Sequence, residues 1–301
     1  MGLLGDRPDR ASRLVVPGAS LTPRPILVTG MPRSGTTWVA QQLASCPGTA
    51  MAGREPMNAR DGQYALGGTL DGWARLEQPT DRQAALLKRA YAGRNLMTFS
   101  RYGVRQWAAP LRNTRVIVKD PFAVLSLPAI VELTRAVPVV VYRHPGAVLA
   151  SFRRMGWSPD PAELRQLEGL APGPDLDEPS SDLELVARMW SVLYRLVLAD
   201  LTAQPTIEAT VVSHEELAGG GERALDRLRV ACGLDPLRRS DPAAADVVDV
   251  DENKLHNLDR DPRTVAAAWR SQLQPGEDTA IEQHTGDVLA VLRERSLRLA
   301  G

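Results

Sequence analysis

Short apolar runs that end at glycine, proline or charged residues recur along the chain, and they predict buried strands. The predicted strands span residues 25–30, 115–119, 137–142 and 207–212. Apolar runs of this length, without regular polar alternation, are typical of strands that are covered on both faces. A parallel sheet with helices packed against both of its faces is therefore expected.

Helical periodicity fills the intervals between these runs. The predicted helices span residues 36–44, 81–92, 145–154, 222–232 and a C-terminal segment that begins near residue 279. A further long helix follows Ser181 and Glu184, whose Ser-x-x-Glu spacing is typical of a capping box. Its apolar stripe comprises Leu183, Val186, Met189, Trp190, Leu193, Val197 and Leu201.

Alternating strands and helices predict a three-layer, P-loop-like α/β fold with a central parallel sheet. Residues 1–24 are expected to be a flexible tail and residues 25–301 a single domain. Residues 52–80 and 156–180 are rich in Gly, Pro and Asp, and we expect irregular loops there, the second of them a candidate lid. Ligands of such sheets bind at the carboxyl ends of the strands.

Charge and cysteine content exclude several classes of protein. Lysine plus arginine equal aspartate plus glutamate at 36 each, so no overall field favours nucleic acid or a membrane surface. No apolar stretch approaches the length of a membrane-spanning helix. Two isolated cysteines, Cys46 and Cys232, give no disulfide framework, and a cytoplasmic location is expected. The excess of arginine over lysine suggests a bacterial source.

A glycine-framed loop follows the first predicted strand and opens the first helix. Its sequence, Gly30-Met31-Pro32-Arg33-Ser34-Gly35-Thr36-Thr37, has the spacing of a phosphate-binding loop. Thr36 occupies the position at which nucleoside triphosphatases carry a lysine, which argues against ATP or GTP hydrolysis. Arg33 lies inside the loop beside several hydroxyl groups, so the pattern predicts a site for one compact anionic group.

A second candidate anchor follows the third predicted strand. Arg143 ends the strand and Ser151 lies on the next helix. This pair alone is weak evidence for an anion-binding site, because an arginine at a strand end is equally typical of a surface salt bridge.

Together the two segments resemble a known family. Met31 to Trp38 is similar to the 5′-phosphosulfate loop of the sulfotransferases, and Arg143 to Ser151 has the spacing of their 3′-phosphate site. The resemblance implies 3′-phosphoadenosine 5′-phosphosulfate (PAPS) as donor and no metal. It implies that the donor is held by Arg33, Ser34, Gly35, Thr36, Thr37, Trp38, Arg143, Ser151 and His214.

Two of these donor contacts have a structural alternative. By the resemblance, Trp38 stacks on the adenine, and His214 stands where the family commonly has a tyrosine that touches this base. Both side chains are equally compatible with the hydrophobic core, since a tryptophan at helical spacing and a partly buried histidine are common core residues.

The catalytic groups depart from part of the family. Cytosolic members place a histidine two residues after a lysine, whereas this chain has Lys119-Asp120-Pro121. Carbohydrate-type and several bacterial members are similar in having a glutamate near Glu55, which we expect to be the general base. Lys119 or Arg33 would neutralise charge on the sulfuryl and bridging oxygens. Asp120 is the competing base, or a structural turn residue.

The C-terminal part resembles the family least. An Arg-Lys-Gly loop that commonly closes on the 3′-phosphate is missing. Arg260, Arg263, Trp269 and Arg270 occupy its region, and the arginines among them are the candidates for its role. The predicted mouth for the acceptor comprises residues 56–75, 100–112 and 156–180.

The predicted activity is transfer of a sulfuryl group from PAPS to a hydroxyl or amine of a glycan or small-molecule acceptor. The choice of acceptor and the oligomeric state stay open. A small-molecule or nucleoside kinase and a non-catalytic nucleotide-binding module are the alternatives, because both would keep the glycine-framed loop.

Overall fold

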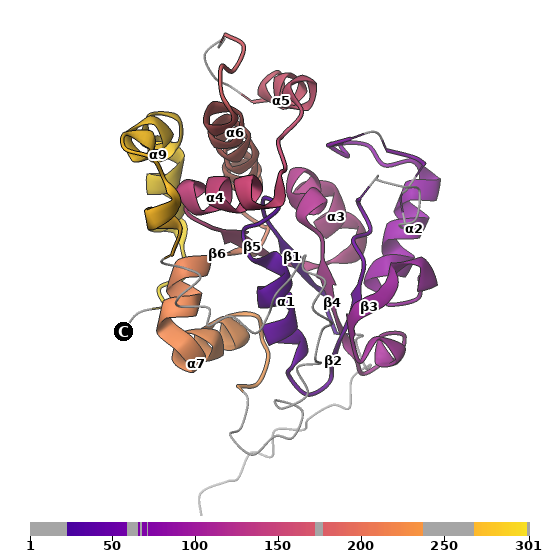
Figure 1. The fold of residues 1–301 in the computed structure, drawn as a ribbon. Coiled ribbons are helices and arrows are strands. Elements are labelled where there is room, and N and C mark those ends of the chain that lie inside the picture. Colours follow the sequence, from indigo (N-terminus) through magenta and orange to yellow (C-terminus); the bar gives the residue numbers. More distant parts are fainter. Residues whose placement is uncertain are drawn as a thin grey trace, which may run out of the picture.

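The computed structural model describes residues 23–58, 66, 68–70, 72–171, 177–236 and 268–299. Its centre is a six-stranded sheet with strand order β3-β2-β4-β1-β5-β6 (Figure 1). The strands are β1 Ile26–Thr29, β2 Thr49–Gly53, β3 Phe99–Val104, β4 Arg115–Lys119, β5 Val137–Tyr142 and β6 Thr210–Ser213. All neighbouring strands are parallel except β2 and β3, which pair antiparallel at one edge. The predicted α/β class is confirmed, with an antiparallel edge strand as the one departure.

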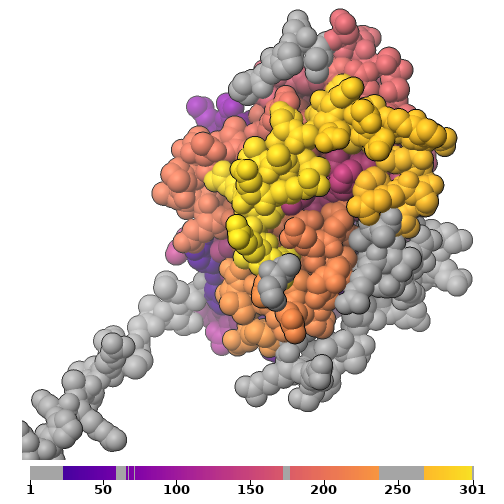
Figure 2. Space-filling view, turned by 90° about the vertical axis from the view of Figure 1, so that its left-hand side faces the viewer, coloured from indigo at the N-terminus to yellow at the C-terminus, as the bar shows by residue number. Residues whose placement is uncertain are grey.

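Helices cover both faces of this sheet. They are α1 Thr36–Ala44, α2 Asp81–Tyr91, α3 Leu127–Thr134, α4 Pro145–Met155, α5 Pro161–Glu168, α6 Asp182–Ala203, α7 His214–Ala231 and α9 Glu277–Arg295. Short 3-10 helices are η2 Leu96–Thr98, η3 Gln106–Ala108, η4 Pro121–Ser126 and η6 Ala268–Gln272. Figure 2 shows α9, in yellow, running across one side of the molecule, where it packs against α6.

Alternating strand residues divide the core into two layers. Ile26 and Val28 of β1 belong to the cluster that includes the apolar residues of α1 and α7. Leu27, between them, points to the opposite face and joins the larger cluster built from α2, α3, α6 and α9. Because both faces of each strand are buried, the strands read as continuous apolar runs.

Several segments, α3 among them, differ from the sequence predictions. β2 and β3 were not predicted, since Thr-Ala-Met-Ala-Gly has little intrinsic strand preference and β2 is extended by its pairing with β4. The predicted irregular lid contains α5, because Asp160 accepts a hydrogen bond from the N–H of Ala162 at 2.8 Å and Pro161 suits the first helical position. α7 begins at His214, earlier than expected, and is kinked at Gly221.

The capping prediction for the long helix is confirmed in part. Ser181 Oγ accepts a hydrogen bond from the N–H of Glu184 at 3.2 Å, whereas the Glu184 carboxylate turns back to the N–H of Ser180 at 2.9 Å. Within the described ranges, no helix combines the length and apolar character that crossing a bilayer requires. The predicted tail lies outside the described residues except for its last two positions.

Candidate active site

The loop between β1 and α1 is pressed against neighbouring strands and helices. Gly30 has φ of 145°, and a Cβ there would lie 2.0 Å from the carbonyl oxygen of Val141. Gly35, the N-cap of α1, has φ of 89°, and a Cβ there would lie 2.2 Å from the ring of His214. Both positions therefore require glycine. No side chain caps the N-terminus of α1, which leaves its first N–H groups facing the loop.

Tyr194 of α6 fastens this loop to β5. Its hydroxyl donates to the carbonyl of Val141 at 2.8 Å and accepts from the N–H of Met31 at 3.2 Å. The Ser34 hydroxyl lies 3.2 Å from the same oxygen. Sequence analysis missed Tyr194. The available signal was a tyrosine within the otherwise apolar stripe of α6, since a buried tyrosine hydroxyl needs a partner.

Arg33 and Ser151, which the sequence placed at opposite ends of the donor, are in direct contact. Arg33 has left-handed backbone geometry, with φ of 72°, and its Nε donates to Ser151 Oγ at 2.9 Å. Arg154 Nη2 donates to the same hydroxyl at 3.2 Å. Arg143, buried at the end of β5, donates to the carbonyl of Arg33 at 3.3 Å. We refer to Arg33, Arg143 and Arg154 as the arginine cluster.

The arginine cluster concentrates positive charge. Burial, followed by repulsion from Arg154 and Arg143, lowers the pKa of Arg33 to about 10. Burial also lowers the pKa of Arg143. Glu215 Oε1 lies 3.9 Å from Arg143 Nε and accepts a hydrogen bond from the N–H of His144. A phosphate or sulfuryl group would relieve this repulsion and gain charge-assisted hydrogen bonds.

Aromatic side chains flank the loop and the arginine cluster. The Arg33 guanidinium lies 5.5 Å from the ring of Trp157, which sequence analysis did not single out. Trp38 and His214 contact each other edge to face, with centroids 5.5 Å apart. His214 is buried, and its Nδ1 has no hydrogen-bond partner. Burial, followed by the charge of Arg143, lowers the pKa of His214 to about 3, so the imidazole is neutral at pH 7.

Glu55 and Lys119 form an ion pair at the carboxyl ends of β2 and β4. Lys119 Nζ donates to Glu55 Oε1, and Asn58 Nδ2 donates to Oε2 at 2.6 Å. Both members of the pair line a cavity of about 430 Å³ together with Thr37, the second residue of α1. The predicted base and the predicted cation therefore meet at the end of the glycine-framed loop.

Asp120, the competing base, is fully buried and is not among the residues that line this cavity. Its carboxylate accepts from the N–H groups of Met57 at 2.5 Å, Phe122 at 3.0 Å and Ala123 at 3.3 Å, and it caps η4. Burial, followed by repulsion from Glu55, raises the pKa of Asp120 to about 8. These contacts fit the structural alternative, in which Asp120 is a turn residue.

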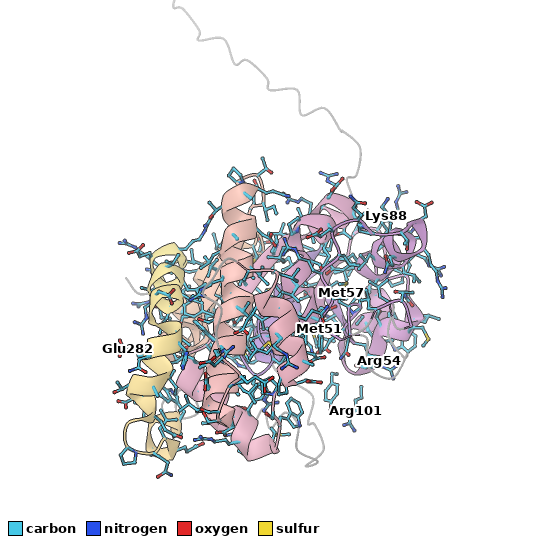
Figure 3. The ribbon with its side chains drawn as sticks, turned by 90° about the horizontal axis from the view of Figure 1, so that it is seen from above. Met51, Arg54, Met57, Lys88, Arg101 and Glu282 are labelled. Atoms are coloured by element: carbon cyan, nitrogen blue, oxygen red, sulfur yellow. The ribbon has the colours of Figure 1, made fainter. Side chains whose placement is uncertain are left out.

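The other lining residues come from β2 and the edge strand β3. They are Met51, Gly53, Arg54, Ser100, Arg101 and Tyr102. Figure 3 shows Arg54 and Arg101 on the same side of the molecule, opposite Glu282 of α9. Of the three segments predicted to form the acceptor mouth, 100–112 contributes lining residues, whereas the described parts of 56–75 and 156–180 do not.

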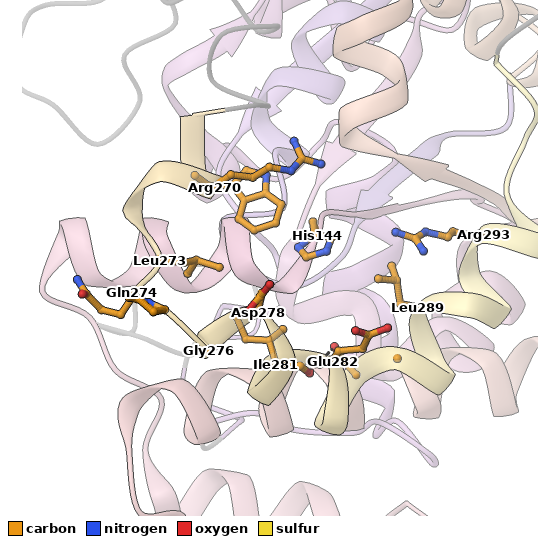
Figure 4. A pocket seen from close by; sticks show the side chains of 14 residues that line it. His144, Arg270, Leu273, Gln274, Gly276, Asp278, Ile281, Glu282, Leu289 and Arg293 are labelled. Carbon is orange, nitrogen blue, oxygen red and sulfur yellow. Dashed lines mark hydrogen bonds between the residues drawn. The ribbon is translucent and has the colours of Figure 1, made fainter.

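A second cavity, of about 620 Å³, lies between α4, η6 and α9 (Figure 4). His144 lies between Arg270 and Arg293 in this view, and its ring stacks on Trp269 with centroids 4.2 Å apart. Burial, followed by the charges of the two arginines, lowers the pKa of His144 to about 4. Of the arginines considered for the missing Arg-Lys-Gly loop, Arg270 lines this second cavity. Arg260 and Arg263 lie outside the described residues.

Comparisons with known proteins bear on the family and the fold. The model of the "Sulfotransferase family" matches residues 25–238. No curated protein matches the chain. A similar solved structure is the sulfotransferase domain of the Synechococcus PCC 7002 olefin synthase, with 21% identity, a TM-score of 0.50, and coverage of 90% of this chain and 95% of that one.

Two further solved structures are more distant. Mouse sulfotransferase SULT7A1, complexed with PAP, is 15% identical, with a TM-score of 0.45 and coverage of 91% and 89% of the two chains. Sulfotransferase STF9 from Mycobacterium avium is 13% identical, with a TM-score of 0.44 and coverage of 90% and 77%. Because the family model matches more than half of the sequence, the chain belongs to the sulfotransferase family.

Proposed function

We propose that this protein transfers a sulfuryl group from PAPS to a hydroxyl or amine of a small-molecule or glycan acceptor and releases adenosine 3′,5′-bisphosphate. The observation that supports this most directly is the arrangement around the β1–α1 loop. The arginine cluster with Ser151 lies on one side, and the Glu55–Lys119 pair lies beside Thr37 at the start of α1. A donor with phosphates at both ends of its ribose needs two separated anion contacts.

In this proposal the 5′-phosphosulfate binds at the uncapped N-terminus of α1, with the hydroxyls of Thr36 and Thr37 as further contacts. The 3′-phosphate binds Arg143, Ser151 and Arg154, where charge-assisted and bidentate hydrogen bonds favour a dianion. The adenine lies against Trp38 and His214. The His214 imidazole is neutral and its Nδ1 has no partner in the protein, so this nitrogen can form a hydrogen bond with the edge of the adenine.

The chemical step needs a base, an in-line acceptor and positive charge on the leaving side. The acceptor oxygen forms a bond to sulfur while the bond between sulfur and the bridging phosphate oxygen breaks. Glu55 takes the acceptor proton, and adenosine 3′,5′-bisphosphate leaves with the bonding electron pair. Of the two candidate cations, Lys119 neutralises the charge that develops on the bridging oxygen, because it lies beside Glu55 whereas the Arg33 guanidinium is bound to Ser151. No oxidant or reductant is required.

The proposal places this reaction in the bacterial cytoplasm. Cys46 and Cys232 are buried free thiols, which suits a reducing compartment.

Calorimetry separates this function from a kinase activity. Adenosine 3′,5′-bisphosphate should bind at least about tenfold more tightly than AMP, because the 3′-phosphate adds charge-assisted hydrogen bonds. ATP with magnesium should bind weakly, since Thr36 stands where triphosphate enzymes carry a lysine. Tighter binding of magnesium ATP would overturn the proposal. Binding of the bisphosphate without PAPS-dependent turnover on any acceptor would indicate a non-catalytic module.

A further inference from the structure

Among the residues that the structure describes, the wall of the cavity beside Glu55 has more positive than negative side chains. The charged side chains in this part of the wall are Arg54, Arg101, Lys119 and Glu55. Lys119 and Glu55 contact each other, so their charges offset within the wall. Among the described lining residues, Arg54 and Arg101 place two further positive charges at one side of the cavity, and such charges attract anions.

Both arginines are held at one side of the cavity by the edge of the sheet. Arg54 directly follows β2, and Arg101 lies on β3, which pairs with β2. The two strands approach so closely that a Cβ on Gly53 would lie 2.5 Å from Ser100 Oγ. Arg54 thus immediately precedes Glu55 in the chain, and Arg101 faces the same cavity from the neighbouring strand.

Arg101 is also oriented by its neighbour. Its guanidinium lies 4.9 Å from the ring of Tyr102, and its Nη2 donates to the Tyr102 hydroxyl at 2.8 Å. An arginine that is already held in place loses less side-chain entropy when it binds a carboxylate or phosphate. The planar guanidinium also matches the two oxygens of such a group.

We propose that the acceptor is a small hydroxyl compound with its own oxyanion, such as a carboxylate or phosphate. Arg101 and Arg54 bind this oxyanion while the hydroxyl lies against Glu55. The inference rests on the proposed function and extends it to the class of acceptor. A cavity of about 430 Å³ is within the usual range for small-molecule sites.

An apolar acceptor is the competing class. Trp107 is 76% exposed, packs edge to face on Phe99 of β3, and lies close in sequence to exposed Leu96 and Leu111. None of these side chains lines the cavity, where Met51 is the single large aliphatic contributor among the described residues. The wall around Glu55 therefore favours the anionic class.

Matched acceptor pairs test the inference. Each pair shares one hydroxyl scaffold and differs in the anionic group: 4-hydroxybenzoate and 4-hydroxybenzamide, glucuronate and glucose, glycerol 3-phosphate and glycerol. Release of adenosine 3′,5′-bisphosphate from PAPS gives kcat/KM for each. The anionic member of the pairs that react should be favoured at least tenfold, and added NaCl should reduce this preference because it screens the attraction.

Three variants assign the preference to Arg101. Arg101→Gln should abolish most of the preference by raising the KM of the anionic member, with the neutral member little changed. Arg101→Lys should retain part of it, since the charge is kept while the bidentate geometry is lost. Arg94→Gln removes an exposed arginine outside the cavity and should leave the preference unchanged.

Each other outcome overturns either the acceptor class or the function itself. Equal or better use of neutral members, a preference that survives Arg101→Gln, or one that depends on Trp107→Ala instead, overturns the anionic class. Turnover of no pair by a protein that binds adenosine 3′,5′-bisphosphate also overturns it. Failure to bind the bisphosphate at all overturns the proposed function, so the two failures are distinguishable.

Discussion

Arg33 Nε donates a hydrogen bond to Ser151 Oγ at 2.9 Å, which joins the loop after β1 to the helix after β5. The two residues are 118 positions apart in sequence. Arg154 donates to the same hydroxyl, so Ser151 accepts from two guanidinium groups. Two cations thus share one neutral hydroxyl oxygen. A bound anion would offer both guanidinium groups a negatively charged acceptor, which forms stronger hydrogen bonds.

Arg143→Ala should weaken binding of adenosine 3′,5′-bisphosphate by about 10- to 100-fold, because it removes charge-assisted hydrogen bonds to the 3′-phosphate. Binding of AMP, which lacks that phosphate, should change little. Calorimetry on both ligands measures this difference. Arg153→Ala is the matched control, since Arg153 pairs with Asp182 and Glu277 outside the arginine cluster. Equal losses for both ligands would show that Arg143 acts on the fold and not on the phosphate.

Glu55→Gln should lower kcat by about 10²- to 10⁴-fold, the usual contribution of a general base. The affinity for adenosine 3′,5′-bisphosphate should stay the same, because the substitution keeps the shape of the side chain. Asp120→Ala should instead affect stability more than turnover. It leaves the N–H groups of Met57, Phe122 and Ala123 without their acceptor and lowers stability, while kcat of the folded fraction is largely retained. Full turnover by Glu55→Gln would assign the proton transfer to another group.

Local sequence signals predicted β1, α1, β4 and β5 closely. Each is an apolar run or an amphipathic segment bounded by its own glycine or proline, so its conformation is determined by nearby residues. β2 and β3 lack such signals, because their extended conformation comes from pairing with each other and, for β2, with β4. The antiparallel edge, and with it the wall that holds Arg101, could not be predicted from periodicity.

The same distinction applies to the candidate site. Arg33, Arg143 and Ser151 were found because they lie in segments with recognisable spacing. Tyr194 and Glu215 contact this site from α6 and α7, and neither carries a local motif. Their positions follow from the packing of whole helices against the sheet. Sequence reasoning therefore identified most of the groups proposed to bind the donor, and it missed Arg154 and the groups that hold the site in place.

Tyr194→Phe should lower the free energy of unfolding by about 1–3 kcal/mol, because it leaves buried backbone groups of Met31 and Val141 without their partner. It should also weaken binding of adenosine 3′,5′-bisphosphate, since the loop is no longer fastened to β5. Urea unfolding and calorimetry measure the two effects. Tyr91→Phe is the control. The Tyr91 hydroxyl is buried without a hydrogen-bond partner, so its removal should cost nothing or stabilise the protein. Equal stability of the two variants would show that the Tyr194 hydroxyl is dispensable.

Acid should destabilise the protein through His214. Its pKa is about 3 in the folded protein, against 6.5 for an ordinary histidine, so between these values the unfolded chain binds more protons than the folded one. The free energy of unfolding therefore falls as the pH drops below 6.5, by up to about 1.4 kcal/mol per pH unit from this group.

Other groups titrate in the same range, and the raised pKa of Asp120 acts in the opposite direction. The informative quantity is therefore the difference between the wild type and His214→Gln, measured by urea unfolding at pH 7.5 and at pH 5. From the first pH to the second, the wild type should lose about 2 kcal/mol relative to the variant. A difference that stays constant would mean that the imidazole becomes protonated without unfolding. The proposal that a neutral imidazole faces the adenine would then be wrong.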